Sequence, residues 1–277
     1  MKLRVLLCLL LLSLIAVPHS AEGEDGGQIR QAFGRMYDLD FAGAHRDIDA
    51  WQKVHPEDPM GPAAHAAAFL FTEFDRLGIL ETQLFTDDDR FEHRKKPSPD
   101  PEIEKQFQQA VDATDDLARK ALAKNAHDIN AQFAQVLSLG LRSDYAALID
   151  KRDLAAIRYT KQSRLLAEQL LQEAPERYDA YLAVGIENYL SGIKPAPVRW
   201  LLQMGGVQTD KAQGLHDLRL TAAHGDLLAP FARLLLAVAA LRDRDTGQAC
   251  SLLGGLAAEF PQNPLYRREL QRSRCSG

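Results

Sequence analysis

Small and apolar residues recur in a fixed order along this chain. A small residue is followed by an apolar or small one four positions on, by an apolar one three further, and by a proline after five more. The order occurs three times, in Ala44, Ile48, Trp51 and Pro56; in Ser163, Ala167, Leu170 and Pro175; and in Ala249, Leu253, Leu256 and Pro261. Steps of four and three lie on one face of a helix, and proline ends it. The pattern predicts the second helix of a repeated helix-turn-helix unit.

Segments that fit the first helix of such a unit precede these motifs or follow them. Gly185 and Ala237 take the small position in two of them, and Gly34 and Tyr37 precede the first motif. No segment shows sustained strand alternation, so the predicted class is all-α. The predicted pairs are 28–38 with 42–54, 61–77 with 101–124, 129–141 with 153–173, 177–190 with 209–223, and 228–242 with 246–259, and a last helix at 264–273 would cover the exposed end.

This arrangement resembles the tetratricopeptide repeat (TPR) family, whose period is 34 residues. The prolines at 56, 175 and 261 are not spaced by multiples of that period, so the resemblance requires insertions, and Ala126 replaces the proline at one further junction. The resemblance implies an α-solenoid of about five antiparallel helix pairs with a C-terminal capping helix. Repeats of this kind hold other molecules and do not transform them.

Residues 192–226 carry a second resemblance. Their order of glycines, prolines and leucines, from "GIKPAPVRWLLQMGG" to "TAAHGD", is similar to a long hairpin of uncharacterised bacterial secreted TPR proteins. It is similar, more faintly, to TPR proteins of the eukaryotic inclusion-body clearance family. Both resemblances imply a helical scaffold, and neither transfers a catalytic residue.

Two stretches interrupt the repeat. Residues 85–101 contain an acidic run, a basic run and three prolines, which predicts a mobile insertion. Residues 191–206 form an apolar segment that we call the hook. The hook could be a docking or interfacial segment, or it could fold over its own helices and fill a groove. Large exposed apolar patches are uncommon in soluble monomers, which favours the second interpretation. Its apolar residues are Val198, Trp200, Leu201, Leu202 and Met204.

The first 21 residues have the pattern of a secretory signal. Lys2 and Arg4 precede an apolar core at 5–17, and small residues follow Pro18. Cleavage could follow Ala21 or Gly23. The core is shorter than the ~20 residues of a spanning helix, although an uncleaved anchor is the alternative. The sequence therefore predicts an exported chain, periplasmic or secreted, with residues 22–277 as one domain and no stable membrane span after cleavage.

Charge and motif searches exclude several functions. Loss of Lys2 and Arg4 would take the formal net charge from −5 to −7, and an acidic domain without a basic stripe is a poor nucleic-acid binder. None of the eight histidines falls in a zinc motif. His45, His55 and His65 are ten residues apart and would not align on one helix, so His65 is expected to be a packed residue. We predict no cofactor, no metal and no enzymatic activity.

The predicted function is to bind a protein or peptide partner on a concave helical surface. Asp179, Leu182, Ile186 and Tyr189 share one helix face and are the candidate groove lining, with Trp200 of the hook. The same four could instead contact the hook. The alternative function is to carry a small apolar ligand in a pocket between helices, with residues 197–204 as a lid.

Three structural expectations concern particular side chains. Gly185 and Ala249 should allow close helix packing. Glu187 is expected to lie outside the packing positions, so that replacing it with leucine should have only a mild effect on stability. Cys250 and Cys275 could form a disulfide, because the stretches 250–259 and 264–273 have matching lengths and an antiparallel turn between them would return the chain to the level of Cys250. The opposite expectation, a buried thiol and a frayed tail, is slightly favoured because the tail is short and polar.

Overall fold

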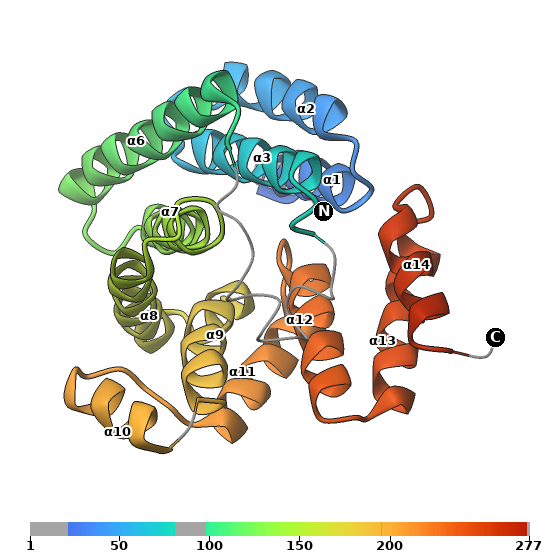
Figure 1. Cartoon of the computed structure of the whole chain (residues 1–277). Coiled ribbons are helices and arrows are strands. Elements are labelled where there is room, and N and C mark those ends of the chain that lie inside the picture. The colour runs from blue at the N-terminus through green and yellow to red at the C-terminus, as the bar shows by residue number, and fades with distance from the viewer. Residues whose placement is uncertain (1–21, 81–97, 195, 276–277) are drawn as a thin grey trace, which may run out of the picture.

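The computed structural model describes residues 22–80, 98–194 and 196–275, and every regular element in these ranges is helical (Figure 1). The predicted all-α class is confirmed. Neighbouring helices pack as pairs that follow one another around the molecule. The helices are α1 (Glu22–Tyr37), α2 (Phe41–Val54), α3 (Met60–Arg76), α6 (Pro101–Lys124), α7 (Ile129–Leu148), α8 (Asp153–Glu173), the short 3-10 turn η1 (Tyr178–Ala180), α9 (Tyr181–Gly192), α10 (Ala196–Met204), α11 (Lys211–His224), α12 (Ala229–Arg242), α13 (Thr246–Glu259) and α14 (Pro264–Arg272).

Most predicted helices begin and end within a few residues of the expected bounds. Helix α1 begins at Glu22, six residues before the predicted start at 28. Helix α7 differs most. It ends at Leu148, seven residues later than the predicted end at 141. Leu141, Tyr145 and Leu148 continue one buried face at steps of four and three. Packing against the neighbouring helices α6 and α8 therefore extends this helix, a contribution that the local sequence does not reveal.

All residues of the recurring motif that lie within helices are buried, which confirms that these positions face neighbouring helices in the core. Ser163 also donates its hydroxyl to the carbonyl oxygen of Val136 at 2.8 Å, so that a polar residue fits the small position. The buried set is Ala44, Ile48, Trp51, Ser163, Ala167, Leu170, Ala249, Leu253 and Leu256.

The turns inside the first and last pairs have the same construction. Leu39 and Arg244 both adopt left-handed backbone, with φ of 63° and 61°. In each turn the following aspartate, Asp40 or Asp245, donates its backbone N–H five residues back and then caps the second helix with its side chain. Glycine usually occupies this left-handed position, so a leucine there is strained by about 1–2 kcal/mol.

The two ends of the chain meet along a seam. The Tyr37 hydroxyl donates to the carbonyl oxygen of Leu227 at 2.9 Å, and the Asn263 side-chain amide donates to the carbonyl oxygen of Tyr37 at 2.8 Å. The aromatic rings of Phe71 in α3 and Phe231 in α12 meet edge to face, 5.9 Å apart. The helix array therefore closes on itself, and its inner side is occupied by its own side chains at this contact.

Cys250 and Cys275 form a disulfide, so the slightly favoured expectation of a buried thiol and a frayed tail is wrong. Their Cα atoms are 5.5 Å apart. The nine residues of α14 run back along α13, which brings residue 275 to the level of residue 250. Tyr266 of α14 is buried against Leu253 and Leu256 of α13, and this contact holds α14 in place. The polar composition of the tail gave no indication of it.

Some predictions concern residues outside the described ranges. The signal segment at 1–21, which ends at the predicted cleavage site after Ala21, and residues 81–97 of the predicted insertion are among them. The other predicted cleavage site, after Gly23, lies within α1. Within the described ranges, no helix combines the length and apolar character that a membrane crossing requires.

Candidate functional site

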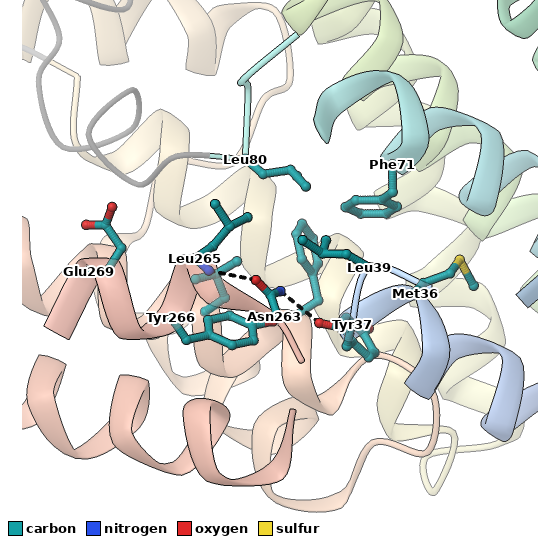
Figure 2. Close-up of a pocket in the computed structure, with 11 residues that line it drawn as sticks. Met36, Tyr37, Leu39, Phe71, Leu80, Asn263, Leu265, Tyr266 and Glu269 are labelled. Atoms are coloured by element: carbon teal, nitrogen blue, oxygen red, sulfur yellow. Dashed lines mark hydrogen bonds between the residues drawn. The ribbon is translucent and has the colours of Figure 1, made fainter. Parts of the chain in front are cut away.

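A hollow lined mainly by apolar side chains opens at the seam, where the first, second and last helix pairs meet (Figure 2). We call it the seam notch. Its volume is about 40 Å³, enough for a few water molecules and too small to enclose a drug-sized ligand. Its lining residues are Met36, Tyr37, Leu39, Phe71, Leu80, Phe231, Leu234, Asn263, Leu265, Tyr266 and Glu269.

Local structure directs these side chains to the notch. The left-handed turn after α1 places Leu39 beside Phe71, and Asn263 at the start of α14 fixes the opposite wall (Figure 2). The Asn263 side chain accepts a hydrogen bond from the backbone N–H of Leu265 at 2.9 Å while it donates to the carbonyl oxygen of Tyr37. The wall is therefore rigidly held to α1.

The chemistry of the notch is apolar with a polar edge. Glu269 is buried and pairs with Arg272 at 2.7 Å. Burial raises the pKa of the Tyr37 phenol well above its ordinary value. A second hollow, polar and about 300 Å³, lies on the neighbouring side of the seam between Arg35, Asp38 and Glu259. Neither hollow is lined by residues 197–204, the predicted lid.

The predicted groove residues of the fourth pair are mostly interior. Asp179 is buried and accepts hydrogen bonds from the backbone N–H groups of Leu227 at 3.1 Å and Leu228 at 2.9 Å, at the start of α12. Burial raises the pKa of the Asp179 carboxyl, although these hydrogen bonds oppose the shift. Leu182 and Tyr189 are also buried, and Ile186 is half-buried. These positions therefore hold the fold together and present no continuous open surface.

Trp200 has a different environment. Its side chain is 63% exposed, and Met204, four residues later on the same face of α10, is 68% exposed. Val198 is exposed as well. The expectation that the hook fills a groove of its own array is therefore wrong for these residues. The described contacts of α10 are with α9 and its own flanking segments, which leave its outer face uncovered.

Glu187 is buried and forms an ion pair with Arg164 of α8, so the expectation that this position lies outside the packing positions is wrong. Burial raises the pKa of the Glu187 carboxyl, and the nearby guanidinium opposes the shift. Arg164 also donates to Glu168 at 2.5 Å, and Glu168 accepts from Gln208 at 2.8 Å. This network ties α8 and α9 to the segment that follows α10.

Two histidines that were not expected to align on one helix lie side by side on neighbouring helices. The Nδ1 atoms of His45 in α2 and His65 in α3 are 2.8 Å apart, and His65 Nε2 lies 3.1 Å from Asp49. Burial lowers the pKa of His45 to about 4, and burial also lowers the pKa of His65. His65 is packed, as predicted, although its partner is another histidine.

Within the described ranges, no group of three or more histidine, cysteine or carboxylate side chains is arranged to hold a metal ion. Comparisons with protein-family models, curated proteins and solved structures find no match to this chain.

Sequence reasoning missed the seam notch because its opposite walls come from segments about 150 to 230 residues apart in the chain. In the sequence, Tyr37 is noted only as part of a repeat. Phe71 and Phe231 are aromatic residues of the predicted helices 61–77 and 228–242, but no local pattern indicates that they meet. Their contact depends on closure of the helix array.

Proposed function

We propose that this chain is an exported, non-catalytic helical scaffold of the TPR solenoid type that binds a protein or peptide partner. The seam notch receives an apolar side chain of that partner. Closure of the array at the contact of Phe71 with Phe231 argues against a long open groove on the inner side. The proposed site is therefore the notch instead of the predicted lining on α9.

The observation that supports this proposal is a strained leucine at an open apolar hollow. Leu39 occupies a left-handed position where glycine would be relaxed, and its side chain lines the notch. Strained backbone tends to persist where a function requires it. Half-buried aromatic and aliphatic side chains around a hollow are the usual receptors for the anchor residues of a partner.

The test is to find the partner by crosslinking from the notch and then to measure its affinity. A photo-crosslinking residue at Leu265 in the notch should capture a partner from the native envelope fraction, while the same residue at exposed Arg119 on α6 should not. The captured segment is then synthesised and its binding to purified protein is measured.

Leu39→Gly is the decisive variant. It relaxes the turn and removes one wall of the notch, so we expect binding to weaken about tenfold with little change in stability, since the loss of one leucine contact offsets the relief of strain. The matched control is Arg244→Gly, which relaxes the equivalent turn between α12 and α13 away from the notch. Equal binding by wild type and both variants would reject the notch as the site.

The carrier function remains the second candidate from the sequence. A lipid or metabolite that co-purifies with the native protein would favour it over the scaffold. The small volume of the seam notch and the position of the hook away from both hollows give it no support.

A further inference from the structure

Exposed apolar side chains gather on one part of this molecule. Eight large apolar residues are exposed in the described ranges, and seven of them belong to α8, the end of α9, or α10. Leu154 is the most exposed of all, at 86%. Apart from Leu190 at the end of α9, the members are Leu154, Ile157, Leu165, Val198, Trp200 and Met204, which we call the hook surface.

The two helices of the hook surface are linked by the segment that follows α10. On α8, Leu154, Lys161 and Leu165 follow one stripe, because seven and four residues are close to whole helical turns. The Lys161 ammonium donates to the carbonyl oxygen of Gly205 at 2.8 Å, directly after α10 ends. The segment directly after α10 therefore lies against the middle of α8, on the side that carries the exposed stripe.

The fold holds this surface in place. Val207, just beyond α10, is buried and donates its backbone N–H to the carbonyl oxygen of Leu202 at 3.0 Å. Gln208 is anchored to Glu168 and to Asn188. Helix α10 lies at the edge of the helix array, beside α9 and α11 (Figure 1). Trp200 and Met204 on this anchored helix are exposed.

The charges around the hook surface are of one predominant sign. The whole chain has a formal net charge of −5, yet no acidic residue occurs from 190 to 209. The nearby acidic groups include Asp150, paired with Arg152 at 3.9 Å, exposed Asp153, Glu168, which is engaged by Arg164, and Asp210, which caps α11. The basic residues beside the apolar set are Lys151, Arg152, Arg158, Lys161, Lys194 and Arg199.

We propose that the hook surface binds the anionic phospholipid surface of a membrane, as a peripheral contact without a span. Exposed tryptophan and aliphatic side chains enter the interface between headgroups and acyl chains, and flanking lysines and arginines attract anionic headgroups. The contact is independent of the seam notch and leaves that notch accessible to a partner. An acidic protein would match the charges but would not require an exposed tryptophan on a projecting helix.

The test uses the full chain with two vesicle preparations, phosphatidylcholine alone and phosphatidylcholine with phosphatidylglycerol. We expect co-sedimentation with the anionic vesicles only, weakened as salt rises. The emission of Trp200 should shift to shorter wavelength on binding. Trp51, the only other tryptophan, is buried in the core, so a Trp51→Phe variant makes Trp200 the sole reporter.

Matched variants distinguish binding by the hook surface from nonspecific binding of the protein to vesicles. Lys194→Gln and Arg158→Gln should each weaken partition about fivefold, and Leu154→Ser and Trp200→Ser about tenfold. The controls are Val54→Ser, a 72% exposed valine on α2, and Lys120→Gln on α6, which should change nothing. Leu154 and Val54 are so exposed that neither variant should disturb folding.

Three results would overturn the proposal. The first is no binding to either vesicle, and the second is equal binding to both. The third is a concentration-dependent dimer that Trp200→Ser abolishes, since a second copy of the chain would then cover the surface.

Discussion

Gly185 and Gly214 face each other where α9 and α11 cross. A Cβ atom on Gly214 would lie 2.8 Å from the carbonyl oxygen of Gly185 and 2.4 Å from the backbone nitrogen of Tyr189. A Cβ atom on Gly185 would lie 3.0 Å from the carbonyl oxygen of Gly214. The two helices are therefore in backbone contact, and the small position predicted at Gly185 has a partner that the recurring pattern did not identify.

Gly214→Ala should destabilise the protein by about 1–3 kcal/mol, because the methyl group meets backbone that cannot move without separating the helices. The matched control is Gly254→Ala in α13, where a new Cβ atom meets nothing within 4 Å. That variant should stabilise by about 0.5–1 kcal/mol through helix propensity. Chemical denaturation measures both, and the same sign for the two variants would contradict the crossing.

Glu187→Leu should destabilise the protein by about 3 kcal/mol, because it leaves the buried Arg164 guanidinium with less compensation. The double variant with Arg164→Leu should recover part of that loss, since two apolar residues remove the uncompensated charge. Urea denaturation of the two single variants and the double variant gives the coupling. Strictly additive effects would show that the pair is not coupled.

The histidine pair predicts loss of stability in acid. Folding lowers the pKa of His45 to about 4 from an ordinary value near 6.5, so the unfolded chain binds the proton more readily. The contribution of neutral, buried His45 to the unfolding free energy is fully present above pH of about 6.5 and is lost as pH falls toward 4. His45→Phe removes the titrating group. Its unfolding free energy should fall less than that of wild type between pH 7 and pH 4.5, and equal slopes would contradict the assignment.

The disulfide should contribute about 3 kcal/mol to stability, since it closes a loop across the last two helices. Native protein treated with an alkylating agent, without reductant, should remain unmodified at Cys250 and Cys275 in a peptide map. The double variant Cys250→Ser and Cys275→Ser should melt earlier and expose α14 to proteolysis first. Alkylation of both cysteines in the native state would rule out the bond.

Helical periodicity and the lack of strand alternation by themselves determined the helical class, and local patterns placed most helices within a few residues of their bounds. Helix periodicity, proline stops and aspartate caps are local, so residues such as Ala249, Leu253 and Pro261 specify a helix and its end without knowledge of the rest. The buried state of these positions also followed from the sequence, because a small residue recurring on one apolar face implies a close neighbour.

Only the tertiary structure decided which distant residues meet. Phe71 meets Phe231, and His45 meets His65, because the array closes and because helices pair at particular registers. Arg164 fixes Glu187 in the interior, and the anchored base of α10 leaves Trp200 exposed. The spacing of apolar residues along a helix indicates which side chains face a neighbouring helix. It does not identify their partners, because these depend on the rotation and register of the other helix, which the local sequence does not encode.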